Sequence, residues 1–119
     1  MTNDVFSIRV GDRLPALAYE FGFSLATALS VNFSARDSES QTVFINRAPD
    51  VIANGTYTIK GTQRVLTPAD GIVFYSWAAG DTVVARKAVI GLFHINWPGG
   101  LQETLPSEGY ERVAILDNF

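Results

Sequence analysis

The feature that most constrains the fold is a high density of β-branched residues in a chain that glycine and proline divide into short pieces. The 119 residues include 11 Val, 8 Ile and 9 Thr, with ten Gly and five Pro spread along the whole length. Val, Ile and Thr suit a pleated, half-buried surface, and no stretch combines helical periodicity with a cap and sufficient length. The sequence therefore predicts an all-β fold, an immunoglobulin-like antiparallel β-sandwich of roughly seven to nine short strands. A chain of this length predicts a single domain over residues 1–119.

Composition argues against several classes of protein before any motif is considered. The chain has no Cys and one His, so we expect no disulfide, no metal site, no cofactor and no catalytic thiol or histidine pair. Nine basic against 12 acidic residues give a net charge of −3 without a basic tract, which argues against nucleic acid as a partner. No apolar run approaches the ~20 residues of a membrane helix, and the polar, acidic start Met1–Asp4 does not resemble a signal peptide. We therefore expect a protein that is not an enzyme and binds no membrane.

Two segments have the patterns of strands at the centre of a sandwich. From Leu25 to Ala35 every second residue is apolar or Thr, which predicts a strand, with a short helix over Leu25–Leu29 as the weaker alternative. Ile72–Trp77 is apolar on both faces, which is typical of a central strand covered on both sides. The side chains that we expect to be largely buried are Leu29, Val31, Phe33, Val73, Tyr75 and Val113.

Turn signals predict how some strands are joined. Asn54-Gly55 tolerates positive φ at both central positions of a type I′ turn, so we expect a hairpin between Val51–Ala53 and Tyr57–Ile59. Val83–Trp97 is too long for one ordinary strand, and we expect a bend or bulge near Lys87 or Gly91.

The side chains that could carry chemistry are better explained as structural ones. His94 lies on one face of a strand pattern, and a general base would need an orienting partner that the sequence does not offer. Asp12, Asp70 and Asp81 each adjoin a glycine at a turn, where Asp commonly accepts hydrogen bonds from backbone N–H groups. Glycoside hydrolysis would require two of these carboxylates to meet across a cleft, and a calcium site would need an Asp-x-Asp pattern that does not occur.

A series of short motifs covers about the whole chain in the order seen in a known family. The motifs are Gly11-Asp12 with Pro15, Phe33-Ser34-Ala35-Arg36, Gly71–Trp77, Asp81-Thr82, Gly91-Leu92-Phe93, Glu103–Pro106, Gly109-Tyr110 and Val113–Leu116. With them, the chain resembles the immunoglobulin-like N-terminal domain of phage baseplate upper proteins, which recurs in tail and fibre-attachment proteins of bacteriophages. Seven Arg against two Lys also suit an assembly surface, because Arg is favoured over Lys at protein interfaces.

The resemblance implies a structural component of a bacteriophage virion, assembled in the host cytoplasm, that acts as an adaptor or joint in the tail, baseplate or neck. Its partners would be other copies of itself, arranged as a symmetric homo-oligomer, and other virion proteins. Because the family domain usually leads into a fibre or receptor-binding portion and this sequence ends at Phe119, we expect the docking module alone. Two alternatives stay open: a capsid decoration or neck protein, and a carbohydrate-binding β-sandwich that would expose Tyr57, Trp77 or Trp97 on one concave face.

One segment departs from the family pattern. The family has a short turn between its Asp-Thr and Gly-x-Tyr motifs, whereas this chain carries Val83–Ile90 there and Phe93 in place of the Tyr. Because the shorter family pattern folds without this segment, we expect that the core does not need it. We also expect that part of it extends a strand beyond the sandwich and contacts a neighbouring subunit or another virion protein. Its basic pair would face acidic groups across that contact, and the alternative is a longer hairpin packed on its own domain. The interface residues predicted in this way are Val83, Val84, Arg86, Lys87, Val89 and Ile90.

Overall fold

The computed structural model describes residues 5–59, 61–106 and 109–118. In these ranges it contains eleven strands and one short 3-10 helix, η1, so the all-β prediction is confirmed with a finer division than seven to nine strands. The elements in chain order are β1 (Val5–Arg9), β2 (Leu17–Glu20), β3 (Ser30–Asp37), β4 (Val43–Pro49), β5 (Val51–Ile52), β6 (Gly55–Ile59), β7 (Thr62–Leu66), η1 (Pro68–Asp70), β8 (Ile72–Tyr75), β9 (Arg86–Trp97), β10 (Leu101–Leu105) and β11 (Glu111–Leu116).

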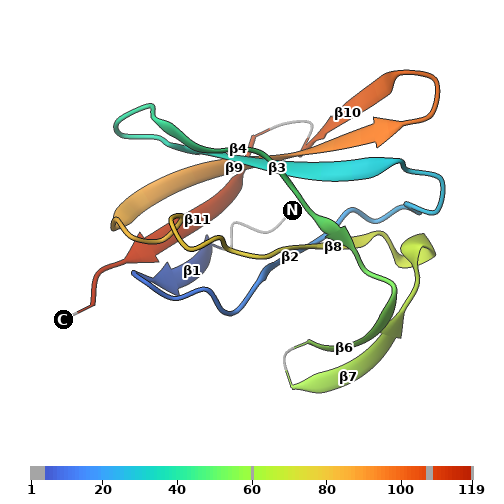
Figure 1. Ribbon diagram of the computed structural model, residues 1–119, viewed down its shortest axis with the longest axis horizontal. Coiled ribbons are helices and arrows are strands. Elements are labelled where there is room, and N and C mark those ends of the chain that lie inside the picture. Colours follow the sequence, from blue (N-terminus) through green and yellow to red (C-terminus); the bar gives the residue numbers. More distant parts are fainter. Residues whose placement is uncertain (1–4, 60, 107–108, 119) are drawn as a thin grey trace.

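Two sheets pack face to face, which confirms the predicted sandwich (Figure 1). The larger sheet has the order β1-β11-β9-β3-β4, and β10 also pairs with β9. The smaller sheet has the order β2-β8-β5 and lies across the larger one. The pairing is antiparallel except between β1 and β11, which run parallel. These two strands come from opposite ends of the sequence, so no hairpin forces them to run in opposite directions.

The twelve-residue strand β9 organises the larger sheet. Its first half pairs with β11 and its second half with β10, while β3 pairs along its other edge. Residues 86–90 of the segment Val83–Ile90 form the start of this strand, so the expectation that the core does not need the segment is wrong. The bulge predicted near Lys87 is confirmed, because the three-residue step from Arg86 to Val89 lies opposite a two-residue step in β11.

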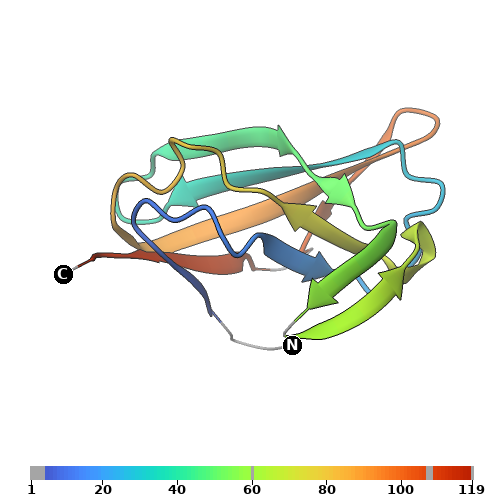
Figure 2. The same cartoon turned by 60° about the horizontal axis from the view of Figure 1, so that its bottom comes forward.

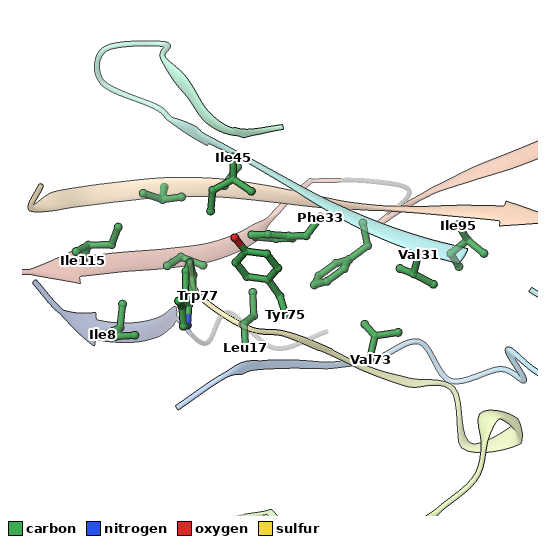
Figure 3. Close-up of a cluster of buried hydrophobic side chains, with 14 of the residues drawn as sticks. Ile8, Leu17, Val31, Phe33, Ile45, Val73, Tyr75, Trp77, Ile95 and Ile115 are labelled. Atoms are coloured by element: carbon green, nitrogen blue, oxygen red, sulfur yellow. The ribbon is translucent and has the colours of Figure 1, made fainter. Parts of the chain in front are cut away.

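The main core fills the space between the two sheets (Figure 3). Phe33 of β3 and Phe93 of β9 are paired across the strands, are fully buried, and have ring centroids 4.9 Å apart. Gly91 makes room for this packing, because a Cβ at that position would lie 2.6 Å from the Phe33 ring. The residues predicted to be buried that are indeed buried are Val31, Phe33, Val73, Tyr75 and Val113.

Leu29 is the exception among the predicted core residues, since its side chain is 69% exposed. The strand begins at Ser30, and the preceding residues form a turn in which the Ala28 N–H donates to the Leu25 carbonyl. Neither a strand from Leu25 nor a helix over Leu25–Leu29 is present. The alternating pattern in the sequence therefore begins before the backbone becomes extended. Leu29 precedes β3, so the pleat of the strand does not determine the direction of its side chain.

The hairpin β6–β7 forms a separate two-stranded sheet that projects from the sandwich (Figures 1 and 2). Gly55 has a φ of +135°, a positive value as predicted, but the predicted hairpin around Asn54-Gly55 is wrong. Strand β5 pairs with β8 and β6 pairs with β7, so the two strands that flank this turn have different partners. A second, small cluster of buried side chains lies at the base of the hairpin and consists of Ala53, Leu66 and Ile72.

Candidate functional site

His94 lies on the outer face of the larger sheet and is held between two hydroxyl groups. Its Nε2 is 3.2 Å from Ser34 Oγ and its Nδ1 is 3.4 Å from Thr104 Oγ1. Burial of the ring lowers the pKa of His94, and the nearby Arg47 guanidinium lowers it further. No described carboxylate orients the ring, so the arrangement fits the structural histidine that the sequence predicts.

The three aspartates that adjoin glycines lie in separate parts of the chain, Asp12 and Asp81 in loops and Asp70 at the end of η1. The backbone N–H of Thr67 donates to Asp70 Oδ2 over 2.7 Å, and the backbone N–H of Ala78 donates to Asp81 Oδ2 over 2.8 Å. These two bonds confirm the predicted role for Asp70 and Asp81, and the Tyr75 hydroxyl also donates to Asp81. At Asp12 the backbone carbonyl accepts a hydrogen bond from the Thr82 hydroxyl. Within the described ranges, no three His, Asp or Glu residues form a group that could hold a metal ion.

The aromatic residues named for a carbohydrate-binding face do not share one. Trp77 is buried, and its Nε1 donates to the Pro15 carbonyl over 3.0 Å. Tyr57 stacks on Phe74 with ring centroids 4.9 Å apart at the base of the β6–β7 hairpin. Trp97 is partly exposed at the far end of β9. The concave aromatic face that the alternative requires is therefore not formed by these three side chains.

The segment Val83–Ile90 is divided between the core and the surface. Val89 is 2% exposed in the main core, and Arg86 Nη1 donates to Asp37 Oδ2 over 2.9 Å while its guanidinium lies 4.4 Å from the centroid of the Phe44 ring. A hydrogen bond from the Glu39 backbone N–H holds the pKa of the Asp37 carboxyl below its usual value, and the hydrogen bond from Arg86 has a smaller effect in the same direction. Arg86 and Val89 are thus used within the domain, which corrects the predicted role of both in an interface.

The rest of this segment is available at the surface. Val83 is 60% exposed and Val84 is 51% exposed, and Lys87 is also exposed, whereas Ile90 is half-buried. The two valines follow Thr82, which is fully buried and donates from Oγ1 to the Asp12 carbonyl over 2.8 Å. The Thr82 carbonyl in turn accepts from the Gly11 N–H. The valine pair is therefore presented on a loop that is tied to the sandwich at its first residue.

The β6–β7 hairpin and the hairpin formed by the end of β9 and β10, which also projects from the sandwich (Figure 1), both expose apolar side chains. Val65 on β7 is 77% exposed, and Leu101 at the start of β10 is 67% exposed. Neither residue was among the predicted interface residues, because single apolar positions next to turns carry no distinct sequence signal. Single exposed apolar side chains are normal on a protein surface, so neither residue marks a contact in the way that the adjacent pair Val83-Val84 does.

A cleft of about 610 Å³ lies beside β2, β9 and β11. Burial raises the pKa of the Glu111 carboxyl in its lining, and burial together with the charge of Glu111 raises the pKa of the Tyr19 hydroxyl. The lining carries charges of both signs, including Glu20, Lys87 and Arg112. This mixture does not select one class of ligand.

A smaller groove of about 300 Å³ lies on the outer face of the larger sheet. Its polar lining includes His94 with Arg36, Arg47, Asn46 and Ser34. Sequence reasoning missed the two arginines. The alternation of β3 could have placed Arg36 on the same face as Ser34, but no local signal places Arg47 there, because a bulge in β4 determines its direction.

The fold and these surfaces define the protein as an all-β sandwich with two projecting hairpins. No described helix is long and apolar enough to cross a membrane. Compared with known proteins, the chain matches no family model, and it matches no curated protein in sequence.

Proposed function

We propose that the chain is a non-enzymatic structural component of a bacteriophage virion, an adaptor or joint in the tail, baseplate or neck. The observation that supports this role best is the exposed pair Val83-Val84 on a loop anchored by buried Thr82. Adjacent exposed valines are unfavourable in water and favourable in a contact. Full burial of an exposed valine contributes about 1.5–3 kcal/mol, and because these two are 60% and 51% exposed, each would gain roughly half of that. The order of the motifs, which resembles that of the phage baseplate upper protein family, supports a phage tail, baseplate or neck as the assembly.

Lys87 completes the surface that we assign to the contact. It is exposed next to the bulge of β9, while the neighbouring Arg86 is occupied by Asp37. A charge at the rim of an interface sets orientation and association rate more than affinity. The contact therefore combines an apolar pair with the exposed cation of Lys87, and its partners are a second copy or another virion protein.

The test compares two exposed valine sites in particles. The double variant Val83→Ser with Val84→Ser should leave the melting temperature of the isolated chain nearly unchanged and reduce its copy number in purified particles, measured by quantitative mass spectrometry. Val65→Ser, on the β6–β7 hairpin, is the matched control and should be incorporated normally. Wild-type copy number for the double variant would overturn the contact, and absence of the wild-type chain from particles would overturn the virion role.

The position of the chain in the virion distinguishes the proposed adaptor from a capsid decoration protein. Immunogold labelling of particles should mark the tail, baseplate or neck. Labelling of the capsid surface would instead support a decoration protein, the alternative within the same class. The burial of Trp77 weighs against the carbohydrate-binding alternative in the aromatic form considered above.

A further inference from the structure

The groove on the outer face of β3, β4 and β9 has a charge opposite to that of the whole chain. Its lining includes the guanidinium groups of Arg36 and Arg47 and no carboxylate among the described residues, although the chain has a net charge of −3. Neither guanidinium forms an ion pair with a described residue. Arg36 Nε is also buried without a hydrogen-bond partner in the described part of the chain. The two guanidinium groups therefore have no anionic partner among the described residues, and an anion in the groove could pair with them.

A β-bulge directs Arg47 into this groove. The two-residue step from Phe33 to Ala35 in β3 lies opposite a three-residue step in β4, which places an extra residue there, and Arg47 has a φ of +50°. A positive φ is uncommon outside glycine and costs free energy. Two hydrogen bonds stabilise this backbone conformation. The Arg47 N–H donates to Ser34 Oγ over 2.9 Å, and Asn32 Nδ2 donates to the Arg47 carbonyl over 2.9 Å.

The remaining lining favours a ligand with both an apolar face and hydroxyl groups. Ile90, Leu92 and the half-exposed ring of Tyr110 supply apolar surface, and the exposed amide of Asn46 supplies both a donor and an acceptor. The volume of about 300 Å³ is at the small end of ligand sites. It suits a unit of the size of one sugar ring and leaves little room for a folded segment.

We propose that this groove binds an acidic sugar unit, with the carboxylate or phosphate group of the sugar on Arg36 and Arg47. Arg presents a planar fork of donors that matches the oxygens of either group. The ring of the sugar would lie against Tyr110 and Leu92, and its hydroxyl groups would reach Asn46. The site is distinct from the exposed valine pair, and the proposal holds or fails independently of the virion role.

The test is a titration of the whole chain followed by NMR, with four probes. Glucuronate and glucose 6-phosphate carry the two kinds of acidic group, glucose carries none, and inorganic phosphate lacks the sugar. At least one acidic sugar should shift the resonances of Ser34, Arg47 and Leu92 and bind at least about tenfold more tightly than glucose, which corresponds to one strong ionic hydrogen bond. Arg36→Gln and Arg47→Gln should each weaken this binding about tenfold, whereas Arg64→Gln on the β6–β7 hairpin makes the same charge change and should leave it unaffected.

His94 gives a second readout that does not depend on the variants. Its resonance is unambiguous because the chain has one histidine. The charged groups that face it are Arg47 from β4 and Arg36 from β3, with Tyr110 at the rim of the same groove. Since burial and Arg47 lower the pKa of His94 in the free protein, a bound anion should raise it.

Four outcomes would overturn the proposal. The first is equal affinity for glucose and the acidic sugars, and the second is an unchanged His94 pKa at saturation. The third is inorganic phosphate binding as tightly as either acidic sugar, which would reduce the site to an anion site without a sugar. The fourth is an acidic peptide, such as acetylated Glu-Glu-Glu, binding more tightly than the sugars, which would indicate a protein partner.

Discussion

The main core and the small cluster beneath the β6–β7 hairpin contain similar apolar residues but differ in how they are enclosed. Among the described residues, fifteen buried ones from both sheets and the adjoining loops form the main core, whereas the small cluster has three, Ala53, Leu66 and Ile72. The hairpin β6–β7 pairs only with itself among the described strands, while β9 pairs with three others. A side chain enclosed by two sheets becomes exposed only when the two sheets separate. A side chain beneath one hairpin can be exposed by local opening, so the two regions should differ in cooperativity.

The largest expected effect is in the main core. Phe33→Ala should lower the free energy of unfolding by about 3–5 kcal/mol, because it removes a fully buried ring between Phe93 and Tyr75 and leaves a cavity. Urea denaturation measures the change, with Val65→Ala as an exposed control. A loss below about 1 kcal/mol would mean that this region collapses around the cavity and is not rigidly enclosed.

A smaller effect is expected beneath the hairpin. Leu66→Ala should cost about 2 kcal/mol, at the low end for a buried Leu, because a hairpin with few neighbours can move to fill the space. Hydrogen exchange should become faster in β6 and β7 and stay unchanged in β3 and β9. Equal acceleration in both pairs of strands would contradict the proposed difference between the regions.

The junction between β4 and β5 should make stability depend on pH. Asp50 lies there, its N–H donates to the Val31 carbonyl, and both of its carboxylate oxygens are buried without a partner in the described ranges. Burial raises the pKa of Asp50 to about 8, while in the unfolded chain it is about 3.9. The folded state therefore binds more protons between these values, and this residue makes stability fall as the pH rises from about 4 to about 8.

Asp50→Asn removes this titration. At pH 8 the variant should be more stable than the wild type by about 1 kcal/mol or more, although its amide still buries polar atoms. The advantage should decline as the pH falls toward 4. Thermal unfolding of both proteins across this range measures the difference in stability between them. Glu111 and His94 titrate in both proteins, so their contributions cancel in this difference. A difference that is independent of pH would show that the carboxyl is ionised in the folded state.

The smallest effect is expected at Leu29, just before β3. Leu29→Ser should change the free energy of unfolding by less than about 0.5 kcal/mol, because the side chain is 69% exposed and belongs to neither buried cluster. A loss comparable to that of Leu66→Ala would place Leu29 in a contact that the isolated domain does not show. Chemical denaturation at several protein concentrations would identify such a contact between copies.

How much could be predicted from the sequence follows from which interactions are local. The alternation in β3 placed Val31 and Phe33 inside, because successive side chains on an extended strand point to opposite faces. Two other local signals were also sufficient: the apolar run Ile72–Trp77 predicted that Val73 and Tyr75 are buried, and the adjoining glycines predicted that Asp70 and Asp81 accept hydrogen bonds from backbone N–H groups. The bulge near Lys87 was also predictable, because the apolar run was too long for a regular strand.

The candidate sites were less predictable, because they depend on pairs of residues far apart in the sequence. Arg86 has a partner 49 residues away, Asp37, and this ion pair removes it from the predicted interface. Arg47 reaches the outer groove through a bulge that Ser34 and Asn32 stabilise from the neighbouring strand. Neither arrangement has a signature within a short window of sequence.

The sequence by itself determined that this chain forms a β-sandwich and which side chains most of its strands turn inward, because strand propensity and side-chain direction are properties of a few consecutive residues. Only the tertiary structure decided which strands pair. It separated β5 from β6 at Gly55 and placed Arg86–Ile90 at the start of the central strand. Pairing is decided by the combined free energy of contacts between distant segments, and the hydrophobic pattern of one strand is compatible with several partners.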